Sequence, residues 1–357
     1  MEACWSTLMS TFKGTFKENF SGDKFTAENF TRAGSQPTHD VLQAPVVWAL
    51  DAFSHDYKLM AKTAEAIIAL APLAPIHPVY VLNEESFEGR GFTSFLKPAL
   101  KTMAFKSLRD LLSHEAFDSV RRHSAIQTPR VILESSSSLD QSVSKLMRYA
   151  KRMGAQMIAL GTHASSPVSR YFTTRFSDVI MREHSVPTLI TGPRQSDISA
   201  QPKVIIFPTD FSEACRDVLQ DVIELARASG AELHFFHKNL HPIDAFVQTG
   251  VHMLGGGWVS VESYFQQIPD EFEQEAEQWL SVAEHAGVKA CLIRENDPES
   301  TADAIVDYAR SLDPLSPMLA MALQATPLSA FLLGSVTRDV IRNSPYPVYL
   351  PARIAQA

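Results

Sequence analysis

The chain has 357 residues, of which 45% are hydrophobic and 20% charged, and this length and composition suit two globular domains with a core each. The net charge of −8 gives no basic surface for nucleic acid. No apolar run approaches the roughly 18 residues of a membrane-spanning helix, the N-terminus lacks the pattern of a secretion signal, and the widely spaced cysteines argue against a disulfide framework. We therefore expect a cytoplasmic protein without a transmembrane segment or a nucleic-acid partner.

Residues 1–44 are predicted to form an N-terminal extension with a regular phenylalanine stripe. Phe12, Phe16 and Phe20 recur every four residues among charged ones, which indicates an amphipathic helix. Such a stripe can pack on the body of the protein or on a second subunit. Contact with a membrane surface and a partly disordered tail are the alternatives.

Residues 45–192 show short apolar runs separated by apolar residues at helical spacing. The runs are rich in Val, Ile and Leu and do not alternate with polar residues, as expected of strands covered on both faces. They lie at 46–50, 76–82, 130–133, 156–160 and 187–191, and the helical stripes lie at 60–71, 143–150 and 172–180.

The same alternation recurs after a linker. Residues 193–202 are polar and contain two prolines, which predicts a connecting segment. Residues 203–352 then give strands at 203–208, 231–237, 288–293, 317–322 and 347–350, with helices at 213–229, 270–286, 299–312 and 333–343.

The two halves match each other at a nearly constant spacing. "VVWALDAF" (46–53) aligns with "VIIFPTDF" (204–211), and Pro187 aligns with Pro347 at a spacing of 160 residues. Such self-similarity predicts a duplicated unit. Strands that alternate with helices predict an α/β fold, here two tandem doubly wound parallel-sheet domains.

Ligands of a doubly wound sheet sit at the carboxyl ends of its strands, so the segment after the fourth strand is informative. It reads "GTHASSPVSRYFTTRFSD" (161–178) in the first copy and "MALQATPLSAFLLGSVTR" (321–338) in the second. Both passages resemble the universal stress protein family, whose loop G-x2-G-x9-G-[ST] holds the phosphates of ATP through its backbone. The resemblance covers 45–352 and implies the adenine nucleotide alpha-hydrolase-like fold of that family.

The glycine pattern of this loop is broken in both copies. The first copy keeps Gly161 but has Ala164 at the second glycine and Thr174 with Arg175 at the last position. A side chain occupies space that glycine leaves open for a close backbone approach. We therefore expect a degenerate phosphate site in the first copy.

The second copy has lost the opposite part of the pattern. Met321 and Gln324 replace the first two glycines, while Gly334 and Ser335 remain. The two copies have thus diverged, each losing different pieces of one loop. ATP remains a possible cofactor, and the sequence alone does not identify the ligand.

The resemblance also implies further ligand contacts. Asp51 and Asp210 match an aspartate near the base and ribose, with a cap of the following turn as the alternative for both. Arg175 could bind phosphate or be solvated, and His163 could be structural or offer one polar contact. The candidate ligand-binding residues are Asp51, Gly161, His163, Arg175, Asp210, Phe211, Gly334 and Ser335.

A histidine cluster near the second strand of the second copy raises the question of a metal. His234 and His237 are three residues apart, so on a strand they face opposite ways, and neither Cys nor carboxylate completes a tetrahedral set. We expect no metal site there. Residues 238–268, with aromatic residues beside three glycines, could form a lid over the second site.

These features predict a binding protein. The sequence contains no motif that pairs a nucleophile with a base and no Walker loop, so we expect a non-enzymatic stress-response protein that binds a small ligand or a partner. An ATP-binding protein or a weak nucleotide hydrolase is the alternative. The resemblance implies an intrachain pseudo-dimer that pairs residues 187–191 with 347–350, and a homodimer is also possible.

Overall fold

The computed structural model describes most of both predicted units. The described residues are 41–83, 97–121, 126–134, 138–162, 174–183, 185–198, 200–238, 269–296, 300–323 and 335–352. The phenylalanine stripe of the extension and the predicted lid lie outside these ranges. We call residues 45–192 the first half and residues 203–352 the second half.

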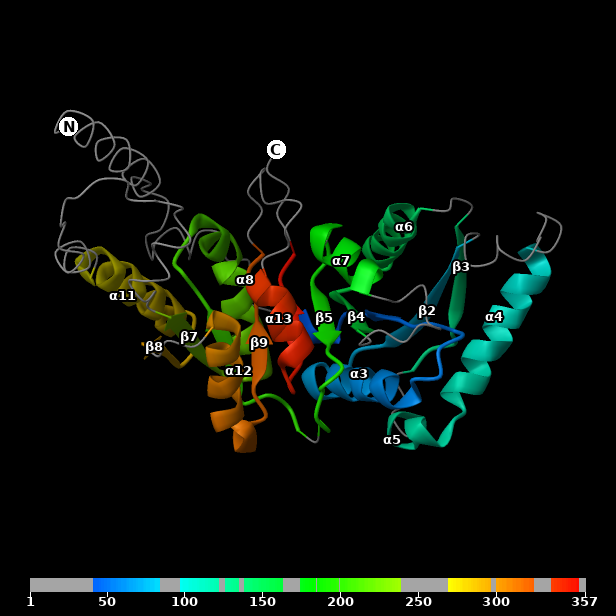
Figure 1. The fold of residues 1–357 in the computed structure, drawn as a ribbon, viewed down its shortest axis with the longest axis horizontal. Helices are drawn as coiled ribbons and strands as arrows, with labels where there is room; N and C mark the ends of the chain where they lie inside the picture. The colour runs from blue at the N-terminus through cyan, green and yellow to red at the C-terminus, as the bar shows by residue number, and fades with distance from the viewer. Residues whose placement is uncertain are drawn as a thin grey trace, which may run out of the picture.

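The described strands form one ten-stranded sheet that crosses the whole molecule (Figure 1). Their order is β3-β2-β1-β4-β5-β10-β9-β6-β7-β8. The strands are β1 (Val46–Ala49), β2 (Ile76–Asn83), β3 (Arg130–Glu134), β4 (Met157–Gly161), β5 (Thr188–Thr191), β6 (Val204–Pro208), β7 (Glu232–Lys238), β8 (Ala290–Glu295), β9 (Met318–Ala320) and β10 (Val348–Leu350).

Each half is a parallel sheet covered by helices, as the sequence predicts. Strands β1 and β5 are buried at every position, which explains why their sequences do not alternate. The longer helices are α3 (Tyr57–Leu70), α4 (Lys97–Leu112), α6 (Leu139–Arg152), α7 (Thr174–Glu183), α8 (Glu213–Ser229), α11 (Pro269–His285), α12 (Thr301–Ser311) and α13 (Ser335–Asn343). The doubly wound α/β fold class is therefore confirmed.

Local signals fix several helix ends. The carboxylate of Asp56 accepts a hydrogen bond from the N–H of Leu59 at 3.2 Å and caps α3. The hydroxyl of Ser300 accepts a hydrogen bond from the N–H of Asp303 at 3.2 Å and caps α12. Gly230 ends α8 in the left-handed region at φ 66°, which glycine adopts without strain.

The two halves join edge to edge through their last strands. Strands β5 and β10 pair antiparallel, whereas the other described strand pairs are parallel. Leu189 lies opposite Tyr349 in this pair. These two residues are 160 positions apart, so equivalent residues of the two halves meet at the centre of the seam.

The linker holds both halves at this seam. Its Gln195 side-chain amide donates to the carbonyl of Pro345 at 2.9 Å, and the N–H of Ser196 donates to the same oxygen at 2.9 Å. Lys62 of α3 forms an ion pair with Asp197 at 3.2 Å. The linker therefore contacts the first half through α3 and the second half through the turn before β10.

Acidic residues of α8 lie beside the buried phenol of Tyr349. Burial, and then the carboxylates of Asp221 and Glu224, raise the pKa of Tyr349 above its usual range. Burial, and then Glu224, raise the pKa of Asp221 to about 6. The seam thus contains a carboxyl group that is easier to protonate in the folded chain than in the unfolded one.

We predict that Asp221→Asn increases stability at pH 7. The folded-state pKa of about 6 exceeds the roughly 3.9 of an unfolded aspartate, so the folded state binds more protons between these values. The contribution of Asp221 to the free energy of unfolding therefore falls as pH rises through this window. Urea denaturation at pH 4 and pH 7 should show a gain for Asp221→Asn at pH 7 and little change at pH 4.

The matched control for this prediction is Glu277→Gln on the exposed surface of α11, which makes the same change of charge. It should give no comparable gain. Equal stability of Asp221→Asn and the natural protein at pH 7 would contradict the assignment.

None of the helices that the structure describes is both long enough and apolar enough to cross a membrane.

Candidate ligand sites at the carboxyl edges of the sheet

The strand order reverses twice, and each reversal defines a candidate site. In the first half β1 lies between β2 and β4, and in the second half β6 lies between β7 and β9. In a doubly wound sheet the chain leaves two such strands toward opposite faces, and the crevice expected between them at their carboxyl ends is where ligands bind. Because the strands of the two halves run antiparallel, the carboxyl ends of their strands point in opposite directions. The two crevices therefore lie on opposite sides of the molecule, one at each end of the strands.

Asp51 and Asp210 follow the first strand of their half and organise the next turn. Asp51 is 6% exposed and its Oδ1 accepts from the N–H of Phe53 at 3.0 Å. Asp210 is exposed, and its Oδ1 accepts from the N–H of Ser212 at 3.0 Å. Both carboxylates thus stabilise local turns, while their contact with a nucleotide stays a prediction.

Gly161 ends β4 at the first crevice, where helix α3 comes close. A Cβ at this position would lie 3.1 Å from Leu59 Cγ and 3.1 Å from Thr63 Oγ1. Its φ lies outside the left-handed region. Glycine is therefore needed here for the close packing of α3, in addition to any role in holding a ligand.

The sequence pattern sets Met321 at the equivalent position in the second half, but the strand register corrects this by one residue. Ile158 lies beside Thr188 and Leu319 lies beside the equivalent Val348, so Met321 corresponds to Leu160 and Ala322 corresponds to Gly161. Met321 follows β9, its N–H donates to the carbonyl of Tyr349 at 2.9 Å, and its side chain is 4% exposed within the core. Met321 is thus a core residue like Leu160, which is 1% exposed, and Ala322 adds a Cβ where the first half has Gly161. The two halves therefore differ at the end of the fourth strand.

Phe211 is a core residue with a strained backbone. Its φ of 58° is uncommon for an aromatic residue, and its ring is 3% exposed. The ring centroid lies 4.9 Å from Trp279, 5.4 Å from His237 and 5.9 Å from Phe272. Phe211 therefore contributes mainly to the aromatic core behind Asp210, and almost none of its ring area is left for a ligand.

His237 supports the turn that carries Asp210. Its Nδ1 lies 2.8 Å from the carbonyl oxygen of Thr209, so the neutral ring donates a proton there. Burial lowers the pKa of His237, mainly because the charged ring would lose its hydration. Its role is therefore structural in the part of the chain that the structure describes.

Cys215 lies one helical turn beyond Asp210 but is poorly suited to act as a nucleophile. Its Sγ is 3.3 Å from Asp210 Oδ1, and burial, followed by the charge of Asp210, raises its pKa to about 11. The thiol is therefore protonated at neutral pH, and a protonated thiol is unreactive.

The remaining predicted site residues are placed only in part. Ser335 is the exposed first residue of α13, at the end of the second loop. Arg175 lies in the first turn of α7, and its side chain is outside the description. His163 and Gly334, with most of both loops, lie outside the described residues.

The structure adds buried threonines that the sequence did not suggest. Thr63 Oγ1 lies 2.5 Å from Thr191 Oγ1, and the N–H of Thr162 donates to the carbonyl of Thr191 at 2.8 Å. They connect α3, β5 and the end of β4 directly beneath the first crevice. The equivalents of Thr162 and Thr191 are Leu323 and Pro351, so this polar cluster belongs to the first half alone.

His234 also has a structural environment. Its Nδ1 lies 2.8 Å from the hydroxyl of Tyr308, and burial lowers its pKa. Within the described ranges, no group of three or more His, Cys, Asp or Glu side chains could hold a metal ion.

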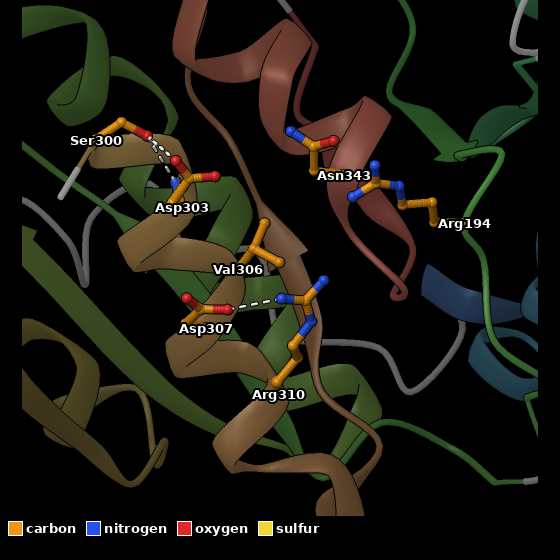
Figure 2. Close-up of a pocket in the computed structure, with 7 residues that line it drawn as sticks. All are labelled: Arg194, Ser300, Asp303, Val306, Asp307, Arg310 and Asn343. Carbon is orange, nitrogen blue, oxygen red and sulfur yellow. Dashed lines mark hydrogen bonds and ion pairs between the residues drawn. The ribbon is translucent and has the colours of Figure 1, made fainter.

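A polar groove of about 500 Å³ lies between α12 and α13. Figure 2 shows Arg194 and Asn343 facing α12 across it. On the α12 side, Asp307 pairs with Arg310 at 2.7 Å. The groove contains none of the predicted site residues, and its charged groups on α12 already bond within their own helix.

Residues 202–350 match the family model described as "Universal stress protein family". These residues are a universal stress protein family domain. The domain includes Asp210, Phe211 and Ser335, and it ends with β10 at the seam. No curated protein matches the chain.

Solved structures extend the likeness in fold beyond this domain. A universal stress protein from Archaeoglobus fulgidus DSM 4304 is 14% identical, with a TM-score of 0.57, and the match covers 88% of this chain and 98% of that one. At this identity it shows the fold alone.

Two further structures are more distant. A functionally unknown protein from Pseudomonas aeruginosa PAO1 is 16% identical with a TM-score of 0.45, covering 88% of this chain and 94% of its own. A universal stress protein from Archaeoglobus fulgidus in complex with dAMP is 22% identical with a TM-score of 0.27, covering 41% of this chain and 94% of its own.

Proposed function

We propose that the chain is a tandem universal stress protein in which residues 45–192 form a second domain of this family. The proposal assigns 1–44 to the extension and 193–202 to the linker. It is supported by the strand order, which is the same in both halves when each is read from its outermost strand to the seam: β3-β2-β1-β4-β5 in the first half and β8-β7-β6-β9-β10 in the second. The nearly constant spacing between equivalent positions, 159 residues from Asp51 to Asp210 and 160 from Pro187 to Pro347, also supports it.

The seam supports an intrachain pseudo-dimer. Asp178 of α7 and Arg338 of α13 are equivalent positions, and they form an ion pair at 3.4 Å. In a symmetric dimer of one domain, a residue near the two-fold axis faces its own copy. Opposite charges at this position therefore favour pairing between the two different halves of one chain.

In our proposal the protein acts in the cytoplasm by binding a small ligand or a partner in response to stress, without catalysis. The observation that carries this is the difference between the halves at the end of the fourth strand, where Ala322 stands at the position of Gly161. A Cβ at this point occupies space that a glycine leaves open for the close approach of a ligand. In our proposal both phosphate loops are degenerate, which favours a ligand other than ATP.

Native mass spectrometry of freshly purified protein tests this proposal. Denaturation should release a small molecule other than ATP or ADP, or none, and added ATP with Mg²⁺ should not be hydrolysed. Stoichiometric ATP or ADP would overturn the degenerate-loop proposal, and turnover of ATP would establish the hydrolase instead.

Two matched variants assign any released ligand to a site. Asp51→Asn and Asp210→Asn make the same change in the two halves, one beside the first crevice and one beside the second, so each reports on one crevice. Loss of the ligand in one variant alone would locate it. Retention in both would show that neither aspartate contacts the ligand.

A further inference from the structure

The outer edges of the sheet are formed by β3 and β8. In the described part of the chain, β3 pairs with β2 alone and β8 pairs with β7 alone. A strand at the edge of a sheet presents unpaired N–H and C=O groups that can pair with another chain. Each edge is therefore a place where association has to be either prevented or used.

The β3 edge is strongly basic. A groove of about 410 Å³ runs along it between α4 and α6, and its cationic lining residues are Lys101, Arg130, Lys145 and Arg152. Glu134, at 3.2 Å from Lys145, is the acidic partner that the structure places there. Helix α4 carries four basic residues and one acidic one, and α6 has the same composition.

The β8 edge has the opposite charge. Helix α11, which packs on β8, carries six acidic residues and neither lysine nor arginine. Glu273 reaches the edge, because it pairs with Arg294 of β8 at 3.2 Å. Glu273, Glu277 and Glu284 are exposed and recur at helical spacing along one stripe.

The basic groove is not required by the fold. In the strand register Arg130 corresponds to Ile293. The matching buried faces of α6 and α12 make Ala304 the equivalent of Lys145 and Ser311 the equivalent of Arg152. The second half thus forms the same strand and helix without any of these charges. The opposite charges of the two edges are therefore a separate property of this chain.

The geometry allows the two edges to meet between chains. The halves are antiparallel, so β8 of a second copy placed beside β3 would run antiparallel to it, an orientation in which two strands can form a regular ladder of hydrogen bonds. The axis of the rotation that relates the two halves is perpendicular to the sheet, so the equivalent helices α4 and α11 lie on the same face of the sheet. The basic α4 of one copy would then lie next to the acidic α11 of the other.

We propose that copies of this chain associate head to tail, with the basic β3 edge of one copy against the acidic β8 edge of the next. Contacts of β3 with β3 or of β8 with β8 would bring like charges together and be disfavoured. If the charges served only to prevent association, the same sign of charge at both edges would do so equally well, and opposite signs would not be needed. This interface is heterologous and leaves a free edge at each end, so it permits assemblies larger than a dimer.

Sedimentation velocity with two charge-reversal variants tests the interface. The first variant, Lys101→Glu with Arg130→Glu and Arg152→Glu, makes both edges acidic. The second variant, Glu273→Lys with Glu277→Lys and Glu284→Lys, makes both edges basic. All six residues are exposed, and circular dichroism with a melting curve checks that each variant is folded.

The natural protein should associate as its concentration rises at low salt and dissociate at high salt, because screening weakens exposed charge pairs. Each variant alone should associate roughly tenfold more weakly. An equal mixture of the folded variants should regain association, because acidic and basic edges then alternate. A natural protein that stays monomeric at low salt, a dimer that does not grow, or a mixture no more associated than its components would each overturn the proposal.

Discussion

Replacing Gly192 with alanine should lower the free energy of unfolding by about 3 kcal/mol or more. Gly192 follows β5, and a Cβ there would overlap the carbonyl oxygen of Ile341 in α13. That oxygen belongs to helix backbone and cannot rotate away as a side chain can. The substitution must therefore push the end of β5 away from α13 and weaken the seam. Equilibrium urea denaturation measures the loss.

Gly154→Ala is the matched control for this substitution. Gly154 has φ 61° and no atom within 4 Å of its would-be Cβ, so alanine there meets strain but no overlap. It should cost about 1 kcal/mol. A Gly192→Ala variant as stable as Gly154→Ala would show that the two halves do not meet as closely as the structure indicates.

Prediction from sequence worked best where burial alone determines the pattern. The run at 213–229 was predicted as a helix and is α8, with the same bounds, and all ten predicted strands are present. Strands buried on both faces leave a continuous apolar signal, and helices with one buried face leave a period near 3.6. Both signals depend only on residues that are close together in the sequence, so they can be read from the sequence alone.

Helix α4 was missed because its pattern is weak. Its fully buried residues, Ala104 and Leu108, are flanked by lysines, and the helix lies at the border of the sheet, where little of its surface is covered. A helix that buries a narrow stripe gives little periodicity. The basic residues that obscured it are those that make the β3 edge distinctive.

The sequence indicated where the strand order reverses but not how the residues there pack. Strands β1 and β4 are neighbours, so Asp51 and Gly161 follow adjacent strands as the sequence predicted, while their contact with a ligand stays a prediction. The sequence could not show that Gly161 accommodates Leu59 and Thr63, about 100 positions earlier, because such contacts depend on tertiary packing. For the same reason it offered Phe211 as a ligand contact, whereas the structure buries its ring among other aromatic residues.

Trp279→Ala should destabilise the second half by about 3–5 kcal/mol, as expected when a large aromatic side chain is removed from a core. Trp279 is 1% exposed, and its ring lies 5.6 Å from Phe235 and 4.9 Å from Phe211. Its loss would remove the neighbour that holds Phe211 at positive φ. The turn that carries Asp210 should therefore loosen, with faster amide hydrogen exchange at residues 209–212.

Two phenylalanine variants separate the ring of Trp279 from its N–H. Trp279 Nε1 donates to Glu275 Oε1 at 2.8 Å, whereas Trp48 Nε1 is buried without a hydrogen-bond partner in the described part of the chain. Trp279→Phe leaves the partly buried carboxylate of Glu275 with one donor fewer, so it should cost about 1–2 kcal/mol more than Trp48→Phe. Equal costs would show that the bond to Glu275 contributes nothing and that the aromatic contacts alone hold the turn before α8.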